Sequence, residues 1–110
     1  AAEPDSFGIL MGDMNGTPSE PPLQYLRGQL PHVGELPELQ NTYDHLQGEY
    51  GRTFHDFAGG LDGEPIDYIF AEDGWTVRYA TIERRDFAGK YPSDHYPVIA
   101  ELQLPFLVNE

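Results

Sequence analysis

The sequence predicts an α+β fold built in layers, and three observations lead to that prediction. One apolar, strand-like run lies near the start, a helix-like segment follows it, and several strand-like segments fill the remainder. The 110 residues are 39% hydrophobic and 13% aromatic, which is typical of a folded domain of this size. Twelve glycines and ten prolines indicate many turns between short elements. We therefore expect one layered domain, or part of one, over residues 1–110.

The first element is expected to be a strand over residues 7–11. Its sequence, FGILM, is almost wholly apolar, which favours a strand that is buried on both faces over a surface strand. Residues 12–22 are dense in Gly, Pro, Asn, Ser and Thr, and they predict a loop at the C-terminal end of that strand.

A helix should follow this loop. Ser19 is its expected N-cap, and the prolines at positions 21 and 22 suit its first turn. Leu23, Leu26 and Leu30 share one helical face, and Gly28 is expected to weaken the end of the helix.

The rest of the chain is expected to be mainly β-structure. Alternating or apolar patterns predict strands at residues 53–57, 66–71, 75–84 and 96–104. Proline and glycine exclude a long element at residues 31–40, and residues 41–46 are expected to form a helical turn. Gly-rich or polar composition predicts loops at residues 58–65 and 87–94.

Charge and composition exclude several classes of function. The net charge is −13 with only six Lys and Arg, so a surface for nonspecific nucleic-acid binding is not favoured within this chain. Clustered carboxylates instead attract hard divalent cations. The absence of cysteine excludes disulfides, thiolate catalysis and Cys-based zinc sites. No apolar run approaches the roughly 20 residues that span a bilayer, and we expect a cytoplasmic protein without a membrane span.

Five polar residues near strand ends are candidates for chemistry: Asp13, Asn15, Asp67, Asp94 and His95. Side chains at strand ends can converge at one mouth of a sheet, where sites commonly form. Each segment also has a structural interpretation. The Asn15-Gly16 dipeptide suits a turn, Asp67 could face solvent from an edge strand, and residues 93–95 could form a polar turn.

These residue types together fit phosphoester hydrolysis. Carboxylates bind magnesium or manganese, and a cation neutralises charge on phosphoryl oxygens. A histidine exchanges a proton near neutral pH, and a carboxylate can hold its ring in one tautomer. An asparagine amide donates to a phosphate oxygen without adding charge.

Four short sequences, in this order, resemble motifs of the endonuclease/exonuclease/phosphatase superfamily: GDMN at 12–15, TFHDF at 53–57, IDYIF at 66–70 and SDHYPV at 93–98. The resemblance covers almost the whole chain and implies the C-terminal half of a four-layer α/β sandwich, in which two mixed β-sheets are flanked by helices. It implies hydrolysis of a phosphoester by in-line attack of water, with Mg²⁺ or Mn²⁺ as cofactor.

The resemblance also implies roles for individual residues. Asp13 would position or activate the attacking water, and Asn15 would contact the scissile phosphate. Asp94 would be a metal ligand. His95 would bind the phosphate or transfer a proton, with its ring oriented by Asp67. Whether Asp13 or His95 is the general base stays open.

Lower-ranking candidates lie in and beyond the TFHDF segment. Thr53, Phe54 and His55 could form part of the substrate wall, although a structural role is the stronger expectation for His55. His32 and His45 are expected to be surface or loop residues.

The family pattern also includes an N-terminal half, with an Asn and a metal-binding Glu, that has no counterpart in this sequence. We therefore expect a fragment that is inactive alone, exposes apolar surface and self-associates through an uncovered sheet. The loop at residues 63–65, GEP, lacks the basic and aromatic residues of DNA-repair members. A nuclease with its basic surface in the missing half, an inactive binding module, and an acidic α+β domain with chance motifs are the alternatives.

Overall fold

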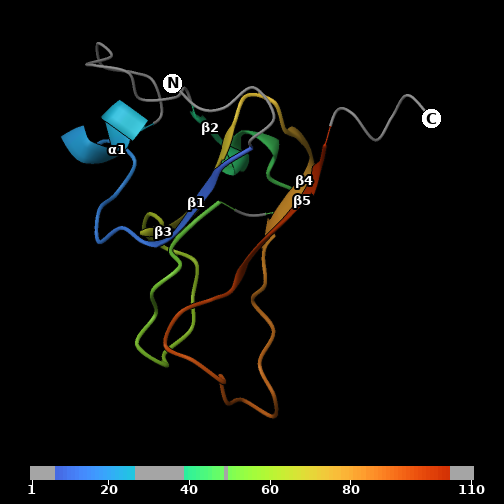
Figure 1. Cartoon of the computed structure of the whole chain (residues 1–110). Coiled ribbons are helices and arrows are strands. Elements are labelled where there is room, and N and C mark those ends of the chain that lie inside the picture. The colour runs from blue at the N-terminus through green and yellow to red at the C-terminus, as the bar shows by residue number, and fades with distance from the viewer. Residues whose placement is uncertain (1–6, 27–38, 49, 105–110) are drawn as a thin grey trace.

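Two antiparallel sheets form the framework of this computed structural model, which describes residues 7–26, 39–48 and 50–104 (Figure 1). The first sheet has the strand order β1-β3-β2, with β1 at Ile9–Asp13, β2 at Leu39–Asn41 and β3 at Asp67–Glu72. The second sheet pairs β4 at Thr76–Ile82 with β5 at Val98–Gln103. The predicted α+β class with two sheets is confirmed, and all strand pairs within these sheets are antiparallel.

Helical structure in the described residues is limited to α1 at Pro21–Leu26 and the 3₁₀ helix η1 at Thr42–His45. The predicted helical turn at 41–46 is therefore confirmed. The helix after the first loop begins one residue later than predicted, because the carbonyl of Glu20 accepts the first helical N–H bond, from Gln24, at 2.9 Å. Glu20 is thus the N-cap in place of Ser19. Gly28, Leu30 and His32 lie outside the described residues.

A core of large side chains joins the two sheets. Tyr68 and Phe70 of β3 meet Ile82 of β4 and Tyr96 of the segment before β5, and Leu23 and Tyr43 close the same cluster. Tyr43 and Tyr68 contact each other edge to face, with ring centroids 5.6 Å apart. Tyr68 of the core follows directly after Asp67 in β3, so the core adjoins the strand end where this candidate residue is found.

Strand β1 is exposed along its whole length, and the prediction of a strand buried on both faces is wrong for the described structure. It lies at the edge of its sheet and pairs with β3 alone. Ile9, Leu10 and Met11 are 46%, 41% and 67% exposed, which confirms the expected exposed apolar surface.

The predicted strand at 53–57 is also absent. Only Phe54 forms a bridge, to His95, and no ladder extends from it. Asp56 and Phe57 have φ values of 53° and 64°, in the left-handed region, which a strand cannot accommodate. The segment instead turns sharply, and loop 51–65 lies beside loop 83–97 below both sheets (Figure 1).

Candidate active site

The ends of β1 and β3 bring two carboxylates to the imidazole of His95. Asp13 and Asp67 are register partners in the β1–β3 pair. His95 Nδ1 lies 2.7 Å from Asp67 Oδ2, and its Nε2 lies 3.9 Å from Asp13 Oδ2. The ring therefore lies between an acceptor that fixes its orientation and a second carboxylate at longer range. We call these three residues the Asp–His–Asp cluster.

The surrounding charges change the pKa of His95. The hydrogen bond to Asp67 raises this pKa above its ordinary value, and partial burial opposes the shift. The negative charges of Asp67, Asp94 and Asp13 add to the increase. An imidazole in this environment holds its proton to higher pH than a free histidine does.

Two side chains form hydrogen bonds with the backbone of Asp67, one with its N–H group and one with its carbonyl oxygen. Thr53 Oγ1 accepts the N–H of Ile66 at 3.0 Å and the N–H of Asp67 at 3.3 Å. The hydroxyl of Tyr43 donates to the carbonyl of Asp67. Burial raises the pKa of Tyr43 well above its ordinary value, so this hydroxyl keeps its proton and remains a donor.

Replacing Thr53 by Val should therefore disturb the Asp–His–Asp cluster from a distance. Valine keeps the volume but removes the acceptor for two backbone N–H groups, which costs about 1–3 kcal/mol for a buried group. We expect a lower denaturant midpoint and a changed His95 ring resonance in the full-length protein. Thr53→Ser keeps the acceptor oxygen and should restore both, and a Ser variant that behaves like Val would contradict the role of the Thr53 hydroxyl.

The segment after β1 forms a turn that uses the Asp13 carboxylate. The N–H of Asn15 donates to Asp13 Oδ1 at 2.9 Å, and Asn15 has a φ of 53°. The turn interpretation of Asn15-Gly16 is thus correct, while the other carboxylate oxygen of Asp13 still faces His95. Tyr68 anchors this turn, because its hydroxyl lies 2.8 Å from the carbonyl oxygen of Gly16.

Loops 51–65 and 83–97 are held together at the site by backbone hydrogen bonds. The N–H of Tyr96 donates to the carbonyl of Thr53 at 2.7 Å, and the N–H of His55 donates to the carbonyl of Asp94 at 2.8 Å. Within the second loop, the N–H of His95 donates to Ser93 Oγ at 3.1 Å, so residues 93–95 form the polar turn as well as carrying His95. The Asp94 side chain is half-buried, next to the cluster but not part of it.

The three candidates for the substrate wall differ in their surroundings. Thr53 and His55 are 0% and 2% exposed, so neither offers a surface to a substrate. The ring of His55 stacks on Tyr96 with centroids 4.2 Å apart, in agreement with its expected structural role. Phe54 is 42% exposed and contacts the His95 ring edge to face at 5.2 Å. Phe54 alone of the three is placed to touch a substrate. The exposed His45 lies in η1, on the surface as predicted.

A cavity of about 330 Å³ opens beside the Asp–His–Asp cluster, lined by residues of β1, β3 and the segment before β5. Asp67 and His95 contribute its polar edge, and Met11, Ile69 and Val98 contribute apolar wall. A small ester that enters this cavity would meet the imidazole at one edge and the exposed end of β1 at the other.

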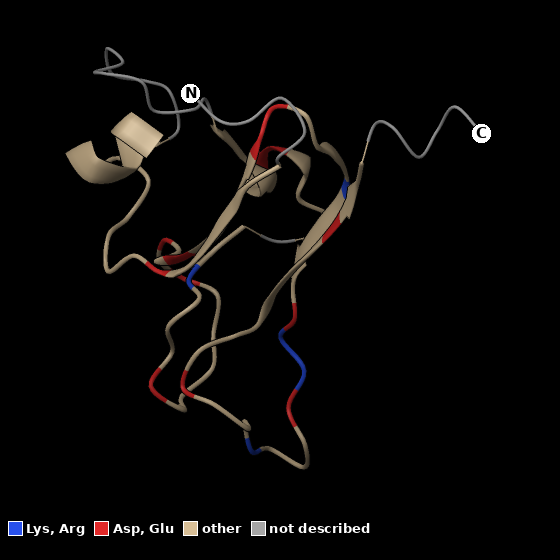
Figure 2. Ribbon diagram, viewed as in Figure 1, with Lys and Arg blue, Asp and Glu red and all other residues tan. Residues whose placement is uncertain are grey.

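Half of the basic residues of this acidic chain lie in the loop that carries His95. Three of the six Lys and Arg, Arg84, Arg85 and Lys90, belong to loop 83–97. Figure 2 shows basic and acidic positions alternating along this loop, and acidic positions where β1 ends and β3 begins. Arg84 packs over the Tyr96 ring at 4.8 Å, whereas Arg85 and Lys90 are exposed. Glu83, Asp86 and Asp94 belong to the same loop, so its three basic residues are balanced by three acidic ones.

The oxygen atoms in this region fit a hard divalent cation. One ligand atom from each of Asp13, Asp67 and His95 lies within 4.8 Å of the others. The hydrogen bond between Asp67 and His95 engages one atom of each residue, whereas Asp13 Oδ2 is unbonded at 3.9 Å from the ring. Carboxylate oxygens are the donors that Mg²⁺ and Mn²⁺ prefer, so Asp13, Asp67 and His95 form a candidate metal site.

Sequence reasoning missed the residues that hold the cluster in place. Tyr43 is 24 positions from Asp67, and no local pattern connects them. The aromatic residues Phe87 and Tyr91 fell in a segment predicted only as loop. The sequence DFAGKYP at residues 86–92 places these two aromatic residues close together with Lys90 between them, and this was the pattern that could have drawn attention to the loop.

A family model described as the endonuclease/exonuclease/phosphatase family matches residues 1–95 of the chain. A search of curated proteins gave no match. No helix in the described part of the chain has the length and apolar character needed to cross a membrane.

Several solved structures are similar to this fold. A functionally unknown conserved protein from Enterococcus faecalis V583 has a TM-score of 0.70 and 28% identity, over 89% of this chain and 36% of its own. An endonuclease/exonuclease/phosphatase from Bacteroides vulgatus has a TM-score of 0.71 and 25% identity, over 89% of this chain and 36% of its own. A mannosyl-6-phosphatase from Bacteroides thetaiotaomicron VPI-5482 shares the fold at 21% identity and a TM-score of 0.70, over 92% and 39% of the two chains. The chain thus spans little more than a third of the length of these proteins.

Proposed function

This chain belongs to the endonuclease/exonuclease/phosphatase family, and we propose that it supplies part of an active site that hydrolyses a phosphoester. The single observation that carries the proposal is the Asp–His–Asp cluster at the mouth of the cavity. Its distances of 2.7 Å and 3.9 Å place a ring of fixed orientation next to a second carboxylate. Such a set can orient water and exchange a proton at a phosphate.

In the proposed reaction, water attacks phosphorus in line with the leaving oxygen, whose bond to phosphorus then breaks. The water proton passes to Asp13 or to His95, and the leaving oxygen finally takes up a proton. Asp67 keeps Nδ1 of the ring engaged, so that only Nε2 can face the substrate. Asn15, at the exposed turn after Asp13, would donate its amide N–H to a phosphate oxygen.

A divalent cation, Mg²⁺ or Mn²⁺, is part of the proposal. Asp94 would hold it, as the family resemblance implies, and Asp13 would be a second carboxylate ligand, because it belongs to the group of close ligand atoms in the structure. When bound, the ion would neutralise charge on the phosphoryl oxygens.

Residues 1–110 would form the C-terminal half of the whole domain. The exposed β1 strand supports a longer domain, and the chain covers 36% of each of two solved neighbours, which is nearer to a third of their length than to a half. A further segment would cover the β1 edge and add metal ligands. We expect the 110 residues alone to show weak metal binding and little turnover.

The substrate would be a small phosphodiester or phosphomonoester rather than duplex nucleic acid. The net charge of −13 opposes a long polyanion, and the three basic residues of loop 83–97 are matched by three acidic ones. A nuclease is the second candidate, since Arg85 and Lys90 are exposed there. Nucleic-acid binding that weakens steeply with salt would favour it.

Hydrolysis by the full-length protein tests the proposal. We expect turnover of a chromogenic phosphodiester or of the matching monoester with Mg²⁺ or Mn²⁺, and loss of turnover when a chelator removes the metal. The ratio of the two rates assigns the ester class. A folded, metal-loaded protein that hydrolyses neither ester would favour an inactive binding module.

A further inference from the structure

The turn that follows β1 contains an Asn-Gly pair, Asn15 and Gly16, whereas the two other asparagines of the chain precede Thr42 and Glu110. In an Asn-Gly pair the backbone nitrogen of the glycine can attack the side-chain amide with little hindrance, because glycine has no Cβ. Asn15 is exposed, so solvent reaches its side chain. Among the asparagines of this chain, Asn15 is therefore the one whose sequence most favours loss of the side-chain amide.

The hydrogen bonds of this turn lie on either side of the reacting pair. The N–H of Asn15 donates to Asp13 Oδ1 at 2.9 Å, and the hydroxyl of Tyr68 lies 2.8 Å from the carbonyl oxygen of Gly16. Among the described residues, nothing accepts the N–H of Gly16 and nothing bonds to the side-chain amide of Asn15. The nucleophile and the group that it would attack are thus both without a hydrogen bond that would hold them apart.

The peptide unit between Asn15 and Gly16 also has two reasons to rotate, as the attack requires. Gly16 is buried, and a buried backbone N–H without a protein acceptor is unfavourable, so the unit gains by turning toward solvent. Asn15 has a φ of 53°, a left-handed conformation that costs free energy for a residue with a Cβ, although asparagine tolerates it better than most. Rotation that brings the Gly16 nitrogen to Asn15 Cγ therefore relieves two local costs.

We propose that Asn15 is a site of spontaneous deamidation, at which the protein loses the amide that would contact phosphate. The modification itself depends only on the turn after β1. Its effect on hydrolysis rests on the proposed function, in which the Asn15 amide donates to a phosphate oxygen.

The reaction needs no partner other than water. The Gly16 nitrogen forms a bond to Asn15 Cγ, and the bond from Cγ to the side-chain nitrogen breaks. That nitrogen leaves as ammonia, taking the proton of the Gly16 N–H, and a cyclic succinimide remains. Water then adds to a carbonyl carbon of the ring. Cleavage at Cγ gives aspartate, and cleavage at the backbone carbonyl carbon gives isoaspartate, in which the main chain runs through the former side chain.

The product would place a negative charge where a phosphate oxygen is proposed to bind. Residue 15 would change from an amide that donates to a carboxylate that only accepts. Its charge would lie in the same turn as that of Asp13, and neighbouring negative charges disfavour an anionic ligand. Isoaspartate would also lengthen the main chain inside the turn, between the hydrogen bonds to Asp13 and Tyr68 that anchor it.

Peptide mapping of the aged, full-length protein tests the modification. The folded protein would be incubated at neutral and at mildly alkaline pH, digested with trypsin and sequenced by tandem mass spectrometry. Trypsin cleaves after Arg27 and Arg52, so Asn15 and Asn41 fall in separate peptides. Asn41 is the matched control, because it is 3% exposed and its Oδ1 accepts the N–H of Tyr43 at 3.0 Å. We expect progressive amide loss at Asn15, faster at the higher pH, while Asn41 stays intact.

Gly16→Ala tests whether the amide is lost through the succinimide. The added Cβ hinders attack by the backbone nitrogen, and it would meet Leu23 Cδ2 at 2.9 Å, the end of a flexible side chain that can move aside. The φ of Gly16 lies outside the left-handed region, so alanine suits this backbone. We expect most of the amide loss at Asn15 to disappear over the same interval. An equal rate in Gly16→Ala would contradict the reaction that we propose.

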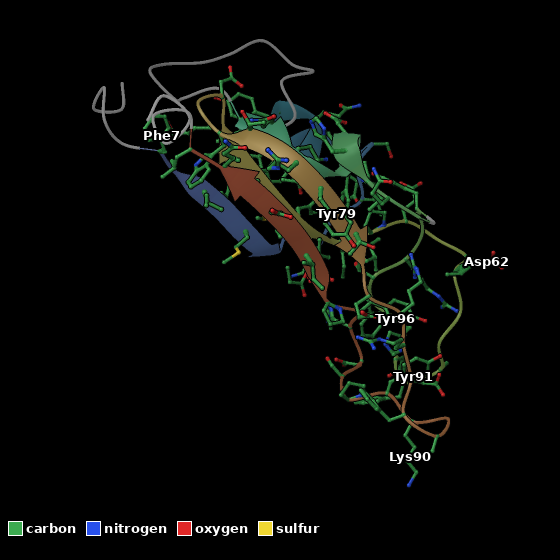
Figure 3. All side chains as sticks on the ribbon, turned by 90° about the vertical axis from the view of Figure 1, so that its right-hand side faces the viewer. Phe7, Asp62, Tyr79, Lys90, Tyr91 and Tyr96 are labelled. Atoms are coloured by element: carbon green, nitrogen blue, oxygen red, sulfur yellow. The ribbon has the colours of Figure 1, made fainter. Side chains whose placement is uncertain are left out.

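Asp62 provides an internal reference for the same ring chemistry. It precedes Gly63 and is exposed, and Figure 3 shows it at the outer edge of its loop, away from the sheets. Its carboxyl group forms the same succinimide with loss of water, so it yields isoaspartate without ammonia. Isoaspartate at Asp62 in a sample whose Asn15 stays intact would show that the turn protects the amide, and it would overturn the proposal.

Activity measurements separate this inference from the proposed function. Asn15→Asp reproduces the aspartate product, and we expect it to lower kcat for phosphoester hydrolysis by a factor on the order of 10²–10³, the usual cost of one lost donor to a developing oxyanion. The activity of the aged protein should fall in step with amide loss at Asn15. Amide loss with full activity would overturn the assigned effect. Amide loss in a protein that hydrolyses no ester would support the modification and count against the proposed function, and an intact Asn15 would overturn the modification whatever the activity.

Discussion

Replacement of His95 by Gln is expected to lower kcat for phosphoester hydrolysis by a factor on the order of 10²–10⁴, the usual contribution of a positioned acid or base. Glutamine can still hydrogen-bond to Asp67, so the local fold should survive. It cannot exchange a proton near neutral pH, and it cannot bind phosphate as a cation. The loss should therefore appear in kcat more than in the free energy of unfolding.

Another histidine of this chain provides a matched control. His45 is exposed in η1 and has no place in the cluster or in the cavity beside it, so His45→Gln should keep the activity of the unchanged protein. Full activity of His95→Gln in the metal-loaded protein would contradict the proposed role. It would leave Asp13 as the group that activates water.

The pH dependence of the same reaction distinguishes the two roles of His95. Its pKa is raised, first by the hydrogen bond to Asp67. If the neutral ring accepts the water proton, kcat should rise as pH increases through this raised pKa. If the protonated ring binds phosphate, kcat should fall over the same interval. This change of kcat with pH should be absent in His95→Gln.

The raised pKa of His95 also determines how the free energy of unfolding changes with pH. Because the pKa of His95 is higher in the folded chain than in the unfolded chain, the charged ring stabilises the fold. This contribution is complete below the unfolded value and is lost as pH rises through the folded one. An NMR titration of the metal-free protein measures both the pKa and its direction.

The Asp67–His95 pair was predicted from the resemblance of IDYIF and SDHYPV to family motifs, and both residues also depart from their local pattern. A carboxylate interrupts the apolar strand IDYIF, and a histidine follows Asp94 just before a strand. Groups at strand ends can converge at one mouth of a sheet, which is consistent with the pairing that the resemblance implied. The hydrogen bond of 2.7 Å between them agrees with that reasoning.

Other features depended on contacts that a linear pattern does not contain. The alternation in TFHDF suggested a strand, but the left-handed backbone at Asp56 and Phe57 ends any extended run there. Thr53 was predicted at the substrate; in the structure it is 0% exposed, and its Oγ1 accepts the N–H groups of Ile66 and Asp67. The apolar character of β1 was evident, but only the sheet order shows that it is an exposed edge.

Replacement of Phe70 by Ala should have the largest effect on folding. Phe70 is 0% exposed in the centre of β3, and its ring stacks on Tyr68 with centroids 5.5 Å apart. Truncation of a buried Phe removes its transfer free energy and leaves a cavity, for a total of about 3–5 kcal/mol. A domain is usually stable by only about 5–15 kcal/mol, so this variant should lose much of its stability.

Chemical denaturation of the full-length protein measures this change, with Phe57→Ala as the control. Phe57 is 60% exposed, and its truncation should alter the free energy of unfolding by less than about 0.5 kcal/mol. Because β3 begins with Asp67, loss of packing at Phe70 should also loosen the carboxylate that orients His95. A Phe70→Ala protein with an unchanged midpoint would show that β3 is not the centre of the core, and that the cluster is held by the loops alone.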